Sequence, residues 1–190
     1  MFIADALRRL GVEWVSLAPR FVGAFEKGID YIGDVGALAE DIAVHAAIAE
    51  RLGPYKLSVH SGSDKFSAYP AIAEATGGVL HLKTAGTSYL EALRAVALHD
   101  EPLLRRIYAF ALERFAEDRA TYHLSAGEPG PGETPDLDNP AARQVLHVTF
   151  GSVLASELGD ELRSRLASDL RDPYADALEH HLGRHCSRFT

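Results

Sequence analysis

The chain has 190 residues, enough for one domain with a substantial core but short for two. Hydrophobic residues make up 47% and charged residues 24%, as in an ordinary globular protein. The net charge is −8 and no stretch concentrates lysine or arginine, so we expect no nucleic-acid partner. The single cysteine, Cys186, cannot form an internal disulfide, which fits a reducing cytoplasm. No apolar run approaches the roughly 20 residues that span a bilayer, and the first residues do not resemble a signal peptide. We therefore expect a cytoplasmic protein without a membrane segment.

Helices and strands alternate along the first part of the chain. Five segments are predicted to be helices, and three shorter segments rich in strand formers are predicted to be strands. Alternation of this kind favours parallel strands covered by helices, that is, an α/β fold. The predicted elements are, in chain order, a helix over 2–10, a buried strand over 12–19, a helix over 38–52, a strand over 55–60, a helix over 69–75, a strand over 79–83, and helices over 87–96 and 102–115.

The C-terminal part of the sequence predicts helices after a long loop. Residues 121–140 are rich in glycine and proline, which is typical of a lid or a linker. Asp138-Asn139-Pro140 predicts a helix start, and apolar residues follow at helical spacing, although 145–150 alone could form a strand. Two further helices are predicted, one over 158–170 and one that begins at Asp172-Pro173 and ends at Gly183.

All three predicted strands end in polar clusters. In parallel α/β folds, ligands bind beyond the carboxyl ends of the strands, because those loops converge there. Packing alone hardly explains three such ends, so we expect a ligand site. The clusters are Arg20, Glu26, Lys27 and Asp30 after the first strand, His60, Ser61, Ser63, Asp64 and Lys65 after the second, and His81, Lys83, Thr84 and Thr87 at the third.

His60 and His81 are the candidate metal ligands. If their strands are neighbours, both imidazoles can reach one ion, and histidine is the commonest metal ligand in proteins. The alternative is that each histidine only forms hydrogen bonds at the strand ends. The other histidines lie on predicted helices or loops and are interpreted as surface or helix-end residues, with His147 the one of most interest.

Glu26 is the candidate acid/base residue, because it lies in a glycine-flanked loop where a carboxylate has no packing role. A pKa raised on closure of the site would suit it to general acid/base work. The alternative is a solvated loop carboxylate, and Asp30 and Asp64 have the same ambiguity. Asp64 can also pair with Lys65 or cap the next helix.

Basic side chains and small residues at the strand ends suit an anionic ligand. Arg20 can bind a carboxylate with two parallel hydrogen bonds, whereas Lys65 and Lys83 offer point charges. The turns Ser61-Gly62-Ser63 and Ala85-Gly86-Thr87-Ser88 supply backbone N–H groups that could cradle an anion at a helix start.

Several of these segments resemble signatures of the tagaturonate/fructuronate epimerase family. They are Ser16–Asp34, His60–Phe66 with Tyr69-Pro70, His81–Ser88 and the closing His181–His185. The resemblance runs over nearly the whole chain. It implies an enzyme of hexuronate breakdown that interconverts D-tagaturonate and D-fructuronate by inverting C4, with a divalent metal (Mn, Zn, Co, Ni or Fe).

For such an activity, we assign roles to residues of this sequence as hypotheses. Glu26 would perform acid/base work, and His60 and His81 would hold the metal. The remaining polar residues would bind the sugar acid, and these are Arg20, Lys27, Ser61, Asp64, Lys65, Lys83 and Thr84.

Family members are longer than this chain, which resembles their C-terminal part. Three βα units are less than half of a (β/α)8 barrel, which takes about 250 residues. We therefore expect a partial TIM-barrel-like fold over 1–120, a loop over 121–140, and C-terminal helices over 141–190 that pack on the barrel. An open half-barrel exposes sheet edges, so the chain is expected to be a fragment, a homo-oligomer, or the partner of a complementing chain.

Two other functions fit the same residues. A metal-dependent aldolase that acts on a sugar acid or sugar phosphate would use the same strand-end chemistry. A non-catalytic half-barrel could instead bind a sugar acid or complete another subunit.

Overall fold

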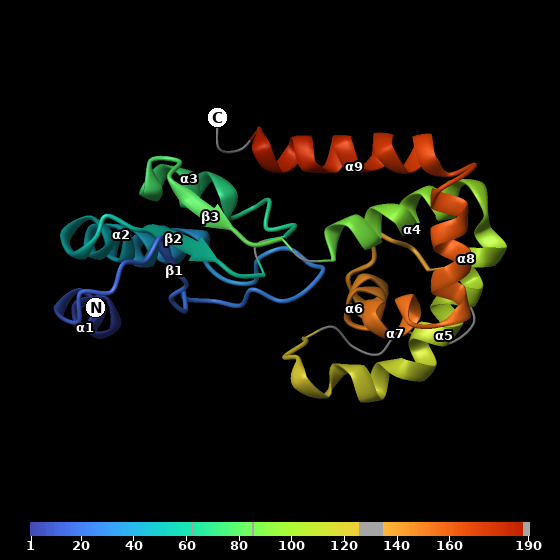
Figure 1. Ribbon diagram of the computed structural model, residues 1–190, viewed down its shortest axis with the longest axis horizontal. Helices are drawn as coiled ribbons and strands as arrows, with labels where there is room; N and C mark the ends of the chain where they lie inside the picture. The colour runs from blue at the N-terminus through green and yellow to red at the C-terminus, as the bar shows by residue number, and fades with distance from the viewer. Residues whose placement is uncertain (62, 85, 126–134, 188–190) are drawn as a thin grey trace. The chain divides into compact units, whose positions relative to one another are not determined.

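The computed structural model describes residues 1–61, 63–84, 86–125 and 135–187 (Figure 1). Over these residues the chain forms two compact units, one from Met1–Phe25, Asp30–Thr84 and the residues from His185 onward, the other from Glu26–Ile29 and Ala85–Arg184. The elements are α1 (Phe2–Arg9), β1 (Ser16–Leu17), α2 (Val35–Leu52), β2 (Lys56–Val59), α3 (Tyr69–Thr76), β3 (Leu80–Leu82), α4 (Thr87–His99), α5 (Glu101–Asp118), the 3-10 turn η1 (Arg119–Thr121), α6 (Pro140–Val148), α7 (Phe150–Leu154), α8 (Glu157–Leu166) and α9 (Arg171–Cys186).

The first unit contains a three-stranded parallel sheet in the order β1-β2-β3, which confirms the predicted parallel α/β character. Leu57 and Val59 of β2 pack into the core with α2 and α3, and Figure 1 shows these two helices beside the sheet. Because side chains alternate along a strand, Ser58 faces the other side of the sheet, where its register partner on β3 is His81. Helices thus cover one face of the sheet, and the face that bears Ser58 and His81 is polar.

Two strands differ from the prediction. The strand expected over 12–19 forms only at Ser16–Leu17, because β1 pairs with β2 from Lys56 onward and β2 is itself short. The third strand, expected over 79–83, forms at Leu80–Leu82, and His81 within it is exposed. As the edge of the described sheet, β3 has a neighbouring strand on one side only.

The helices of the first unit begin and end close to the predicted residues. The Asp34 carboxylate caps α2 by accepting a hydrogen bond from the Ala37 N–H at 2.8 Å, as N-cap carboxylates do. Leu38 and Ile42 are fully buried on one face of α2. The apolar stripe predicted for α1 is instead exposed, with 83% of Phe2 accessible.

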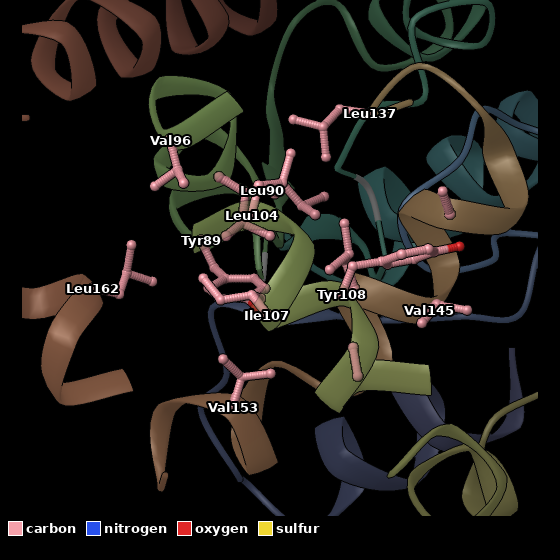
Figure 2. Close-up of a cluster of buried hydrophobic side chains, with 14 of the residues drawn as sticks. Tyr89, Leu90, Val96, Leu104, Ile107, Tyr108, Leu137, Val145, Val153 and Leu162 are labelled. Carbon is pink, nitrogen blue, oxygen red and sulfur yellow. The ribbon is translucent and has the colours of Figure 1, made fainter. Parts of the chain in front are cut away.

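The second unit is helical and has its own hydrophobic core. Figure 2 shows Leu90 of α4 beside Leu104 and Ile107 of α5, and Val145 of α6 and Val153 of α7 belong to the same cluster. Asp100 caps α5 and Asn139 caps α6. The segment 145–150, which could also have formed a strand, is helical through Val148.

The division of the chain differs from the predicted parts. Helices α4 and α5, expected within the part over 1–120, share a core with α6–α8, because their buried faces meet those helices. Helix α9 does not end at Gly183 but continues to Cys186. Residues 126–134 of the predicted 121–140 loop lie outside the described residues. No helix within the described ranges is both long and apolar enough to cross a membrane.

Candidate functional site

Glu26 is buried in the second unit, with 7% of its surface exposed. Its Oε2 accepts three hydrogen bonds, from the N–H and Oγ of Ser125 at 2.8 and 2.9 Å and from Nε2 of Gln144 on α6 at 2.9 Å. The interpretation of Glu26 as a solvated loop carboxylate is therefore wrong. The carboxylate is a fixed part of the second unit.

The pKa of Glu26 is lowered from its ordinary value, whereas the acid/base role predicted from the sequence called for a pKa raised on closure of the site. Burial acts to raise the pKa, because it penalises the charged form, but the hydrogen bonds from Gln144 and Ser125 and the nearby His123 lower it by more. Hydrogen bonds donated to a carboxylate favour its charged form. In this arrangement Glu26 is ionised at neutral pH, and its lowered pKa makes it a weaker base than an ordinary carboxylate.

Helix α6 holds the loop that carries Glu26. Arg143 donates a hydrogen bond from Nε to the carbonyl of Gly28 at 2.7 Å, and Gln144 binds Glu26 as described. One turn later, His147 is buried against Gly28 and Gly86, so closely that a Cβ built on Gly86 would lie 2.4 Å from its Nε2. Glycine at both positions allows this close approach.

Lys27, predicted to bind substrate, lies over the ring of Tyr122 with its Nζ 5.5 Å from the ring centroid. A cation at this distance is attracted by the aromatic face. Both residues belong to the second unit. The side chain is therefore held close to the Glu26 loop, and its role in substrate binding stays a prediction.

In the first unit, the segment after β2 has an unusual backbone. Ser61 and Asp64 have φ angles of 52° and 62°, in the left-handed region that few non-glycine residues adopt. Strained residues of this kind cluster at functional sites. The ammonium group of Lys65 is fully buried and donates a hydrogen bond to the carbonyl of Ser63 at 3.0 Å.

Asp64 pairs with His185, a residue far away in the sequence. The Asp64 N–H donates a hydrogen bond to Nε2 of His185 at 3.3 Å, and its Oδ1 lies 3.9 Å from the same nitrogen. The rings of Phe66 and Tyr69 flank the imidazole, with centroids 5.0 and 5.5 Å away. Both members of the pair are buried, so Asp64 is not a solvated carboxylate.

His181 precedes His185 by one turn of α9. Residues four apart on a helix lie on the same face, and these two histidines are the buried residues in the last turns of α9. Nδ1 of His181 lies 3.2 Å from Oε1 of Glu91 on α4. The two atoms are close enough for an ion pair. No donor among the described residues forms a hydrogen bond of good geometry with Oε1.

Of the two predicted metal ligands, one lies just after β2 and the other on the neighbouring strand β3, and both are exposed. His81 shares a hydrogen bond between its Nδ1 and the Ser58 Oγ at 2.9 Å. His60 directly follows β2. The assignment of His60 and His81 as ligands stays a prediction.

The remaining predicted residues lie in the loops at the carboxyl edge of the sheet. Arg20, Lys83 and Thr84 are exposed there, and Ser61 is half-buried. Asp30 accepts hydrogen bonds from the Ser67 N–H at 3.1 Å and Ser67 Oγ at 2.9 Å. Its carboxylate therefore joins the loop after β1 to the loop after β2.

Four residues that contact the candidate groups were not identified from the sequence. Gln144 is a neutral residue on a predicted helix, and Ser125 is next to a loop, so neither carries a pattern that marks it. His181 and His185 do carry one, since two histidines spaced four apart on a helix are typical of a shared ligand. We had interpreted them as helix-end residues.

Comparisons with known proteins all match one enzyme family. The tagaturonate epimerase family model matches residues 1–189. Tagaturonate/fructuronate epimerase of Thermotoga maritima is 44% identical over 194 residues, covering 97% of this chain and 40% of that protein. The crystal structure of fructuronate-tagaturonate epimerase UxaE from Cohnella laeviribosi is 41% identical, with a TM-score of 0.92 over 99% of this chain and 41% of that chain.

A crystal structure of the same Cohnella laeviribosi enzyme with one glycerol bound gives a TM-score of 0.91 at 40% identity, over 99% of this chain and 41% of that chain. The chain thus spans about 40% of the length of the relatives it matches. Family model, sequence and fold agree over essentially its whole length, and on these grounds the chain belongs to the tagaturonate epimerase family.

Proposed function

We propose that the chain is part of a cytoplasmic enzyme of hexuronate breakdown that interconverts D-tagaturonate and D-fructuronate by inverting C4, with a divalent metal. The observation that carries the proposal is the likeness to UxaE, at a TM-score of 0.92 over 99% of this chain. Because the chain covers 41% of UxaE, its three parallel βα units are proposed to be part of a larger, TIM-barrel-like fold.

The position of C4 relative to the ketone limits the ways in which C4 can be inverted. C4 is β to the C2 ketone, so its C–H bond is not acidified by that carbonyl. Its hydroxyl group, however, makes the substrate a β-hydroxyketone, in which the C3–C4 bond can break reversibly. Loss of the hydroxyl proton leaves an aldehyde at C4, and the electron pair of the broken bond forms an enolate at C2–C3. Bond formation to the other face of the aldehyde inverts C4 and returns the proton to the new hydroxyl.

Glu26 is proposed to take and return this proton. Hydrogen bonds hold its carboxylate in place and keep its pKa below the ordinary value, so it enters the reaction ionised. Lys83 and Arg20, both exposed at the carboxyl edge of the sheet, offer positive charge for the substrate carboxylate. A bound divalent metal supplies Lewis acidity for the ketone and hydroxyl oxygens.

The experiment mixes the purified chain with D-tagaturonate and Mn²⁺ and follows D-fructuronate by chromatography. We expect Glu26→Gln to abolish turnover and the exposed control Glu50→Gln to leave it unchanged. Substrate deuterated at C4 should keep its deuterium, because the C4–H bond is never broken. Loss of deuterium to solvent would contradict C3–C4 cleavage.

The other two functions give different results in the same assay. An aldolase would release dihydroxyacetone and tartronate semialdehyde without fructuronate. A non-catalytic partner would show no turnover and would form a dimer or a mixed complex in light scattering.

A further inference from the structure

We propose that the first unit carries a docking surface, made by α1, the outer side of α2 and the free edge of β1. Its occupant is the larger part of the epimerase chain, which these 190 residues do not cover. The inference rests on the proposed function in one respect, namely that the chain is part of a larger enzyme. The elements that form the surface all belong to the first unit.

Helix α2 is apolar on two opposite sides. Leu38 and Ile42 lie on its inner side and are fully buried in the core of the unit. Val44, Ala47 and Ile48 lie on the other side, because residues three and four apart share one face of a helix. Val44 is 60% exposed. A helix that is apolar on both sides is normally buried on both, so the outer side of α2 indicates a further packing partner.

Helix α1 presents a second apolar stripe to solvent. Ile3, Ala6 and Leu10 recur at spacings of three and four, so they share one face of the helix. Ile3 is 65% exposed and Leu10 is 76% exposed. Ala4 is the one buried residue of α1, which is eight residues long. An isolated helix of this length is not stable in water, so α1 depends on its contacts, and its apolar stripe is available for another one.

A groove separates α1 from the outer side of α2. Its volume is about 600 Å³, and Phe2 and Val44 are among the residues that line it. Charged residues lie at the same groove, where Arg9 pairs with Asp5 at 2.9 Å and Arg51 contributes a further cation. An apolar centre with a polar rim is the usual arrangement of a protein–protein interface.

The edge of the sheet continues this surface. Within the described sheet, β1 pairs with β2 alone, and Val15, which directly precedes β1, is 77% exposed. An unpaired edge is a template for another strand, and parallel sheets are normally covered. Figure 1 shows α1 next to α2 in the first unit. A second hollow, lined by Arg8 and Val15, shares Leu52 with the groove, so the surface is continuous from α2 to β1.

The comparison with UxaE supports the choice of occupant. UxaE has the fold of this chain over 99% of its residues, yet the chain covers 41% of UxaE. The larger part of that enzyme therefore lies outside the match and is available to cover the apolar surface. We expect it to contribute an apolar helix face to the groove and a strand to the β1 edge. A second copy of this chain is the alternative occupant, and the experiment distinguishes the two.

The test supplies the remainder of the enzyme as a separate polypeptide. The affinity-tagged chain is co-expressed with the part of the Cohnella laeviribosi enzyme that lies outside the match, and the tag is used to purify whatever binds. Sedimentation velocity then gives the stoichiometry, for which we expect one copy of each polypeptide. Dissociation on dilution gives the Kd. In the complex, hydrogen exchange of the α1 amides should be slower than in the chain alone.

Three charge substitutions test the surface itself. We expect Phe2→Asp, Val44→Asp and Val15→Asp each to raise the Kd by about 100-fold or more, because the new carboxylate would be buried in an apolar interface. Leu98→Asp is the matched control, since Leu98 is 77% exposed but lies on α4 in the second unit. It should leave the Kd unchanged. Circular dichroism verifies that each variant is folded, and Val44 lies inside the long helix α2, where a single exposed substitution is tolerated.

Three results would overturn the proposal. They are the absence of the remainder from the purified chain, a complex whose Kd is unchanged in folded Val44→Asp, and a homodimer of the chain that the Val44→Asp substitution dissociates. A complex that forms through this surface but does not epimerise D-tagaturonate would leave the inference standing and count against the proposed function. The two failures are therefore distinguishable.

Discussion

Replacing Gly86 by alanine should destabilise the second unit far more than an ordinary glycine substitution. Gly86 has a φ of 78° and directly precedes α4. Its added Cβ would lie 2.4 Å from Nε2 of His147, well inside van der Waals contact. His147 is 3% exposed and cannot move aside without disturbing α6.

Two costs combine in this variant. A left-handed backbone costs an alanine about 1–2 kcal/mol, partly offset by about 0.4–1 kcal/mol from the stiffer unfolded chain. Overpacking of a buried site costs about 1–3 kcal/mol. We therefore expect Gly86→Ala to lower the free energy of unfolding by about 2–4 kcal/mol.

Gly77 provides a matched control. Its φ is 57°, and a Cβ added there would meet no atom within 4 Å. Gly77→Ala thus strains the backbone in the same way but produces no clash. It should lower the free energy of unfolding by about 1 kcal/mol or less. The difference between the two substitutions isolates the crowding of His147.

The assay is urea unfolding followed by circular dichroism, with hydrogen exchange of the α6 amides to report on the second unit. Two compact units need not unfold together, so the local probe is required. In a His147→Ala background, Gly86→Ala should cost no more than Gly77→Ala. Equal effects of the two glycine substitutions in the parent chain, or no rescue by His147→Ala, would refute the reasoning.

Two further predictions concern a carboxylate and the core. The pKa of Glu26 lies below its ordinary value of 4.5, so its ionised form stabilises the fold above pH 4.5, and this contribution is lost as the pH falls through the folded-state pKa. In Glu26→Gln, the free energy of unfolding measured in urea should fall less steeply as the pH is lowered. An unchanged pH dependence would contradict the role of the Glu26 carboxylate in stability. Truncation of the fully buried Leu104 to alanine should lower the free energy of unfolding by about 2–5 kcal/mol. Truncation of the exposed Leu98 should change it little in the same measurement.

The alternating pattern could be read from the sequence because it depends on local periodicity. Asp34, Asn139 and Pro140 mark helix starts through their own chemistry, and the parallel order of the strands follows from the helices between them. Strand length was not predictable in the same way. How far β1 extends depends on the residues of β2 opposite it, which no local pattern contains.

The site was predictable only in part, for a related reason. The polar ends of the strands are visible in the sequence, and they marked Asp64 and Glu26 as candidates. What these carboxylates bind is set by residues 121 and 118 positions away, His185 and Gln144. Such partners are fixed by the fold, so the sequence identified the carboxylates but neither the histidine beside Asp64 nor the lowered pKa of Glu26.

Each unit depends on a segment that the sequence places in the other. Glu26–Ile29 belongs to the second unit, although its flanking residues belong to the first, and His185 belongs to the first unit, although the rest of α9 belongs to the second. The hydrogen bonds of Glu26 with Gln144 and of Asp64 with His185 each join such a segment to its unit. Glu26 and Asp64 are candidate site residues and also make these connections. Cleaving the chain at Thr84 or Arg184 would therefore separate a candidate site residue from its hydrogen-bond partner and remove a segment of that unit's fold. Neither unit can therefore be expected to keep its candidate site when expressed as a continuous piece.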